Sequence, residues 1–231
     1  IPSGFDQRSS AEKAFAQALA DTKVSANEIN GIAATGMGRK EVYMHPPISA
    51  NKEVTEVTAS ARGTAFLFPS VRTVIDVGAE EGRAIRCDAN GKVVDFAVNE
   101  KCAAGAGAFT EAMARALEIS VEQLGELSLT STQAVPMNAQ CAVFAESEVV
   151  SLIHAKTPKN DIARAVHDAI ASRIVSMARR VGIENDIVLV GGLARNKGFV
   201  KSLQDAIGNN VLIPQEPEFA GAIGAALLAG E

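Results

Sequence analysis

Helical periodicity is the most regular pattern in this chain. Between residues 162 and 181, apolar side chains recur every three or four positions, which places them on one face of a helix. Those side chains are Ile162, Val166, Ile170, Ile174, Met177 and Val181. Similar patterns predict helices at residues 9–23, 52–67, 103–118, 142–155 and 219–229, and a further helix that starts near residue 198. We expect Ser9 or Ser10 to cap the first helix, and residues 25–28 (SANE) to form a capping box.

Short apolar runs between these helices predict β-strands. Residues 72–78, 82–87 and 92–98 form a predicted β-meander, and its Asn90-Gly91 pair favours a tight hairpin turn. Residues 186–190 predict a buried parallel strand, and residues 31–35 and 211–214 predict two shorter strands. Because strands alternate with helices, the pattern indicates an α/β fold.

The composition narrows the classes of function. The 231 residues are 47% hydrophobic and 21% charged, which allows a substantial core. The net charge of −5 argues against nucleic acid as a partner, and no apolar run is long enough for a membrane span. The first residues (IPSG) resemble neither a signal peptide nor a natural start, so we expect that the chain is cut or processed upstream.

Two of the three cysteines stand where a predicted helix begins. Three cysteines are too few for a disulfide framework, so we expect a cytoplasmic setting. Cys102 and Cys141 each precede a helical segment, and the positive end of a helix dipole stabilises a thiolate or an anionic metal cluster. An iron–sulfur cluster usually takes four thiolates, so two per chain suggest one cluster shared by two chains. Spacing alone favours a small buried hydrophobe at each position, and this is also how we interpret Cys87.

Two glycine turns follow predicted strands, at residues 76–78 (DVG) and 190–192 (VGG). Glycine lets backbone N–H groups approach a phosphate or an adenosine closely, although each turn alone is a weak signal. Neither a P-loop nor the dinucleotide fingerprint is present. An acidic strand end with a hairpin, then helices, then a late Gly-Gly turn resembles the second half of the actin-like (ribonuclease H-like) ATPase fold. In that fold the hairpin holds phosphates and the late turn lies against adenosine.

Longer segments extend this resemblance to a particular family. The segments are residues 34–39 (ATGMGR), 74–78 (VIDVG), 99–107 (NEKCAAGAG), 141–149 (CAVFAESEV) and 191–194 (GGLA). They resemble the ATPase subunits of benzoyl-CoA reductases and the activators of 2-hydroxyacyl-CoA dehydratases. Residues 82–85 (GRAI) look more like the smaller ATPase-type reductase subunit, because activators usually carry Gly-Gly-Gln-Asp after the acidic strand. The family's first strand and first phosphate loop have no match here.

The resemblance implies a two-lobed organisation and a set of site residues. Residues 1–70 would be the remainder of the first lobe, with residues 219–231 packing back on it, and residues 71–218 would be the second lobe. Asp76 would be catalytic, and Cys102 and Cys141 would hold a [4Fe–4S] cluster on the axis between two chains. Nucleotide, as ATP with Mg²⁺, would contact Asp76, Gly78, Ala79, Gly82, Gly105, Gly107, Gly191, Gly192 and Ala194.

The implied function is ATP-driven, low-potential electron transfer. Our main expectation is a subunit of an ATP-dependent benzoyl-CoA reductase, a ferredoxin-dependent oxidoreductase, and the alternative is the homodimeric activator of a 2-hydroxyacyl-CoA dehydratase. The expected partners are a homologous ATPase subunit or a second copy, the catalytic acyl-CoA reductase or dehydratase subunits, and a ferredoxin-like donor. A small-molecule kinase of the same fold, or a cluster-free regulatory paralogue, is the rival interpretation from another class.

Overall fold

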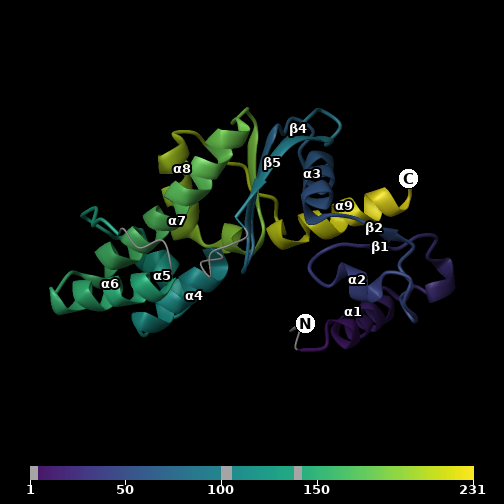
Figure 1. Cartoon of the computed structure of the whole chain (residues 1–231), viewed down its shortest axis with the longest axis horizontal. Helices are drawn as coiled ribbons and strands as arrows, with labels where there is room; N and C mark the ends of the chain where they lie inside the picture. The colour runs from purple at the N-terminus through teal and green to yellow at the C-terminus, as the bar shows by residue number, and fades with distance from the viewer. Residues whose placement is uncertain (1–4, 100–105, 138–141) are drawn as a thin grey trace.

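A four-stranded sheet forms the centre of the molecule. The computed structural model describes residues 5–99, 106–137 and 142–231. The sheet order is β5 (Val93–Val98), β4 (Gly82–Cys87), β3 (Thr73–Val77) and β6 (Ile187–Val190) (Figure 1). The first three strands are antiparallel, which confirms the predicted meander, and β6 runs parallel to β3. None of the described helices is both long and apolar enough to cross a membrane.

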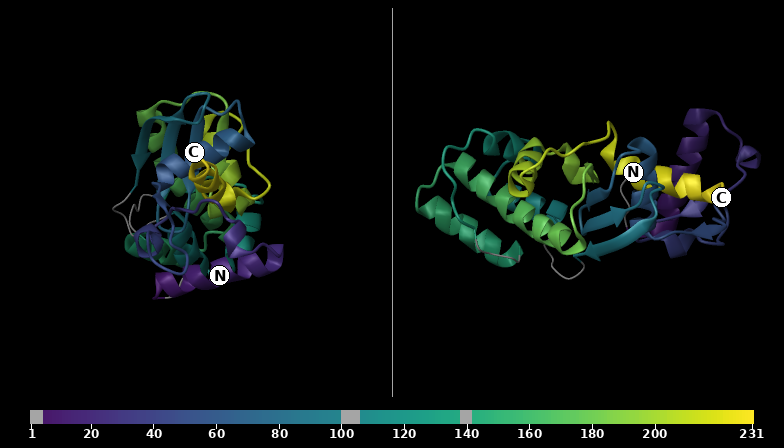
Figure 2. Two further views of the ribbon diagram at one scale, coloured as in Figure 1. Left: turned by 90° about the vertical axis from the view of Figure 1, so that its right-hand side faces the viewer. Right: turned by 90° about the horizontal axis from the view of Figure 1, so that it is seen from above.

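The two faces of the sheet are covered by different helices, as Figures 1 and 2 show. Successive residues of a strand point to opposite faces. Ile75 and Leu189 therefore pack into a large core, whereas Val74 and Val188 pack into a smaller core on the opposite face. The large core includes α4 (Ala106–Ala116), α5 (Val121–Ser128), α7 (Lys159–Val181) and α8 (Lys197–Ile207). Helices α3 (Glu56–Leu67) and α9 (Ala220–Ala229) cover the other face.

Several predicted elements differ from the structure at their ends. The first helix, α1 (Gln7–Thr22), is capped by Asp6, whose carboxylate accepts from the Ser9 N–H at 2.9 Å, so the prediction of a serine cap is wrong. The helix predicted from residue 52 begins at Glu56 because Thr55 caps it. Residues 211–214 form only an isolated bridge to β6, at Leu212.

The remaining short elements lie near the N-terminal end of the chain, and α6 lies at the opposite end of the molecule (Figure 1). Strand β1 (Ala33–Ala34) pairs in parallel with β2 (Lys52–Glu53), and α2 (Arg39–Val42) lies between them in the sequence. The predicted capping box is confirmed at η1 (Ala26–Glu28), since the Ser25 N–H donates to Glu28 at 2.7 Å. Helix α6 (Ala142–His154) packs against α4.

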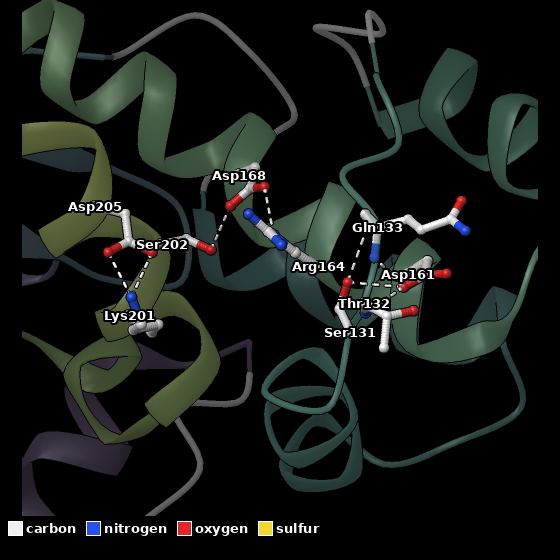
Figure 3. A network of polar contacts seen from close by, with 9 residues as sticks. All are labelled: Ser131, Thr132, Gln133, Asp161, Arg164, Asp168, Lys201, Ser202 and Asp205. Atoms are coloured by element: carbon white, nitrogen blue, oxygen red, sulfur yellow. Dashed lines mark hydrogen bonds and ion pairs between the residues drawn. The ribbon is translucent and has the colours of Figure 1, made fainter.

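A polar network fastens the segment after α5, and helix α8, onto α7 (Figure 3). The buried carboxylate of Asp161 accepts hydrogen bonds from the Ser131 hydroxyl at 2.8 Å and from the N–H groups of Thr132 and Gln133 at 3.0 and 3.1 Å. The Ser131 hydrogen bond is the main cause that lowers the pKa of Asp161. About two turns further along α7, Asp168 accepts from the Ser202 hydroxyl of α8 at 2.6 Å.

Helices α3 and α9 cross at two glycines. A Cβ atom at Gly224 would collide with the Ala59 carbonyl oxygen and lie 2.6 Å from the Gly63 nitrogen. A Cβ at Gly63 would in turn collide with the backbone of Ala220. The two backbones can approach this closely only because neither position carries a side chain.

We predict that Gly224→Ala lowers the free energy of unfolding by about 2 kcal/mol, because the added methyl group forces the helices apart. Gly221→Ala, one turn earlier in α9, is the matched control. Within the described part of the chain, its Cβ would meet only the Ser60 hydroxyl, at 3.7 Å, so the substitution should be neutral or slightly stabilising. Chemical denaturation of both variants measures the difference, and equal effects would contradict this explanation of the crossing.

Candidate functional site

Two adjoining cavities lie where β3 and β6 end. The larger has a volume of about 470 Å³ and the smaller about 280 Å³, and Gly78 and Gly192 line both. Gly78 opens the turn between β3 and β4, and Gly192 begins the short helix η2 (Gly192–Arg195) after β6. The carboxyl ends of neighbouring parallel strands are the usual place for ligands in an α/β sheet. The two predicted glycine turns therefore come together at one site.

The two glycines of the turn after β6 differ in what a side chain would meet. Gly191 has φ +88°, and a Cβ there would lie 2.8 Å from the Asp76 carboxylate. Among the described residues, no atom lies within 4 Å of the Cβ position of Gly192, so the missing side chain leaves open space in the cavities. A ligand can therefore approach the backbone at Gly192 as closely as a nucleotide requires.

The turn after β3 is bonded directly to the start of α4. The Gly78 N–H donates to the Glu81 carbonyl at 2.9 Å, which closes the turn. The carbonyls of Gly78 and Ala79 accept from the N–H groups of Gly107 and Ala108, at 3.1 and 2.9 Å. A Cβ at Gly107 would lie 2.7 Å from the Cα of Ala79. Two N–H groups in the first turn of α4 thus find their partners in the turn that lines both cavities.

Asp76 lies at the inner end of the smaller cavity and is nearly buried. Burial raises the pKa of its carboxyl, and the Ser60 hydroxyl, which donates to it at 2.6 Å, partly opposes that shift. Ser60 belongs to α3, so the carboxylate links the sheet to a helix on its second face. An ionised carboxylate in this position can hold a cation or orient a water molecule in the cavity.

The smaller cavity also contains charged residues that the sequence analysis did not single out. Glu56 and Arg83 line it, and Glu81 contacts Arg83 from the turn. A usable signal for Glu56 was present, because an acidic residue directly after a threonine cap stands at the positive end of a helix dipole. The described residues include no group of three or more His, Cys, Asp or Glu side chains that could hold a metal ion. Glu56, Asp76 and Glu81 instead share the guanidinium of Arg83.

The larger cavity has a charged rim. Glu111 of α4 and Glu122 and Glu126 of α5 lie on it, as do Arg195 and Lys197. Arg195 forms ion pairs with Glu216 and Glu218. The volume falls within the range for small-molecule sites, and the rim offers both acceptors and donors to a polar ligand. The larger cavity can therefore admit a small polar ligand.

The predicted site residues fall into three groups. Lining one or both cavities are Asp76, Gly78, Ala79, Gly107, Gly191 and Gly192. Gly82 and Ala194 line neither of these two cavities, because Gly82 faces Ile174 of α7 and Ala194 is buried in the large core. Cys102, Gly105 and Cys141 lie outside the described residues. Cys87 is confirmed as a buried residue, and burial raises the pKa of its thiol to about 11.

Comparison with known proteins gives a consistent result. A family model described as the BadF/BadG/BcrA/BcrD ATPase family matches residues 3–229. The chain is 38% identical over 220 residues to the activator of lactoyl-CoA dehydratase from Anaerotignum propionicum, covering 95% of this chain and 83% of the relative. It is 33% identical over 224 residues to a benzoyl-CoA reductase subunit from Thauera aromatica, covering 94% of this chain and 77% of the relative.

A solved structure shows the same fold. The activator of the 2-hydroxyisocaproyl-CoA dehydratase from Clostridium difficile with bound ADPNP has a TM-score of 0.87 and 35% identity, covering 94% of this chain and 80% of that one. This likeness confirms the predicted actin-like ATPase fold.

We predict that Gly192→Val weakens the binding of Mg–ADPNP by at least about tenfold, because we expect the nucleotide to lie in the open space that the side chain would fill. The same space around the Cβ position means that the fold should tolerate the change. Isothermal titration calorimetry measures the affinity, chemical denaturation checks the fold, and Gly192→Ala should have an intermediate effect. If a folded Gly192→Val protein bound Mg–ADPNP with unchanged affinity, the prediction that the ligand lies against this turn would be wrong.

Proposed function

The chain belongs to the BadF/BadG/BcrA/BcrD ATPase family, and we propose that it is the ATP-driven activator of a 2-hydroxyacyl-CoA dehydratase. The named activator matches at higher identity than the reductase subunit does, 38% against 33%. The alternative of the sequence analysis is therefore better supported than its main expectation. The match to a family of ATPases favours ATP hydrolysis over the rival kinase interpretation.

ATP is proposed to span the two cavities, with adenosine in the larger and phosphates in the smaller. The glycine turns at Gly78 and at Gly191–Gly192 would lie against it, and Asp76 would face the phosphates with Mg²⁺. Space at Gly192 and the contact of both turns with both cavities support this placement. The assignment of residues 1–70 with 219–231, and of 71–218, to two lobes stays a prediction, as do nucleotide contacts at Gly82, Gly105 and Ala194.

One observation carries the proposal that the nucleotide controls a redox centre. The carbonyls of Gly78 and Ala79, at the nucleotide turn, accept hydrogen bonds from the first turn of α4. Helix α4 begins at Ala106, four residues after Cys102, and α6 begins at Ala142, directly after Cys141. A shift of the turn on nucleotide binding would therefore act on the helix that follows one proposed cluster ligand.

Cys102 and Cys141 are proposed to hold a [4Fe–4S] cluster together with the same residues of a second copy. The cluster would supply one-electron transfer, and ATP hydrolysis would make that transfer one-way. A ferredoxin-like protein would donate the electron, and the dehydratase component would receive it. A heterodimeric benzoyl-CoA reductase ATPase subunit remains the second candidate, which residues 82–85 (GRAI) and the similarity to the Thauera aromatica reductase favour.

We predict that Cys102→Ser and Cys141→Ser each abolish iron binding and separate the dimer, because the shared cluster loses two of its four thiolates. Iron and sulfide analysis after anaerobic purification, with light scattering for the mass, measures both effects.

Cys87→Ser is the matched control, because Cys87 ends β4 and is buried in the smaller core. The Cys87→Ser protein should keep its full iron content. A Cys102→Ser or Cys141→Ser protein that kept its iron and its partner would contradict the assignment. A wild-type dimer without iron would instead support a cluster-free regulatory protein.

A further inference from the structure

Arg83 holds three carboxylates from three different elements. Its Nη2 contacts the Glu56 carboxylate of α3 and lies 2.7 Å from Oε2 of Glu81 in the β3–β4 turn. Its Nη1 lies 3.3 Å from Oδ2 of Asp76, the residue directly opposite it on β3. All four side chains are largely buried, with the Arg83 side chain only 11% exposed. The guanidinium is therefore the common partner of α3, the sheet and the turn.

The charge of this group is not balanced. Three carboxyl groups share one guanidinium, so acidic side chains outnumber the cation three to one. Among the described residues that line the smaller cavity, Arg83 is the one cation. Glu218, the other acidic group on its lining, is paired with Arg195. A polyphosphate that enters brings further negative charge, so it needs a divalent cation and a donor from the protein.

Because Arg83 is largely buried, its guanidinium depends on direct contacts with other groups rather than on water. Burial lowers the pKa of the guanidinium and raises the pKa of the Asp76 carboxyl, so both groups have lost water that direct contacts must replace. A guanidinium binds phosphate oxygens with the same two-pronged geometry that it uses for carboxylates. Phosphate can therefore replace a carboxylate at Arg83 without leaving the guanidinium unpaired.

We propose that Arg83 is a positioning residue that exchanges its partners when the nucleotide binds. In the absence of nucleotide it holds Glu56 and Glu81. When phosphates enter, it donates to their oxygens, and the freed carboxylates turn to the divalent cation and its bound water. Because Glu56 belongs to α3, the exchange also releases α3 from the β3–β4 turn. This inference rests on the proposed nucleotide site and adds a regulatory contact to it.

Arg83→Gln tests the exchange with three probes on the full chain. Mn²⁺ alone, without nucleotide, should bind at least about tenfold more tightly than to wild type, because the carboxylates lose their internal cation. Mg–ADPNP should bind about ten- to a hundredfold more weakly, because a charged hydrogen-bond donor to the phosphates is lost. Adenosine, which has no phosphate, should bind with unchanged affinity. A purely structural role for Arg83 would lower the affinities for adenosine and Mg–ADPNP together, whereas contact with phosphate lowers only the affinity for Mg–ADPNP.

Two further variants keep the test interpretable. Arg83→Lys retains the positive charge but loses the two-pronged hydrogen-bonding geometry of the guanidinium. The affinity for Mn²⁺ should therefore stay near that of wild type, and the affinity for Mg–ADPNP should fall between those of wild type and Arg83→Gln. Arg83→Lys also provides the ADPNP comparison if Arg83→Gln does not fold. Arg86→Gln is the matched control, because Arg86 lies on the same strand but pairs with Glu184 and the Val181 carbonyl, away from both cavities. It should leave all three affinities unchanged.

The possible failures are distinguishable. If wild type binds Mg–ADPNP but Arg83→Gln and Arg83→Lys bind it equally well, the partner exchange is wrong and the nucleotide site stands. Unchanged Mn²⁺ affinity in a folded Arg83→Gln protein would likewise overturn the exchange. If wild type binds neither Mg–ADPNP nor adenosine, the proposed function itself fails.

Discussion

The hydrogen bonds between the turn after β3 and the first turn of α4 are the contact on which the rest of the site depends. The carbonyls of Gly78 and Ala79 cannot reach the N–H groups of Gly107 and Ala108 unless both backbones approach closely, which the missing side chain of Gly107 allows. Helix starts need partners for their free N–H groups. Here a turn that lines both cavities supplies them, so cavity and helix are joined through backbone atoms alone.

Close backbone approach and buried charge shape the site in different ways. Glycines hold α3 against α9, β6 against β3, and the turn against α4, and each position excludes a Cβ for steric reasons. The positions of the charged side chains depend less on steric exclusion than on the need for polar partners that replace lost water. Asp76, Glu56 and Glu81 have lost water, and Arg83 is their common partner in the structure. Steric exclusion therefore sets how closely the backbones approach, whereas contacts with Arg83 hold the charged side chains.

Local signals were enough for much of the fold and for part of the site. Strand β4 occupies the predicted residues 82–87, because a glycine turn and the Asn90-Gly91 hairpin mark its two ends. The two glycine turns were predicted to meet, and they do. Contacts between residues distant in the sequence carry no local signal, which is why the Arg83–Glu56 pair was missed. Helix α5 was also missed, since its eight residues are too few to show a clear period despite its capping box.

The most direct test of the central claim is hydrogen–deuterium exchange at the amides of Gly107 and Ala108, with and without Mg–ADPNP. We expect nucleotide to slow exchange at these two amides by about tenfold, because a bound nucleotide orders the turn whose carbonyls accept from them. The segment that contains Gly191 and Gly192 should become protected in the same experiment, which shows that the nucleotide is bound. Protection at that segment with unchanged exchange at Gly107 and Ala108 would contradict the claim that the nucleotide turn controls α4.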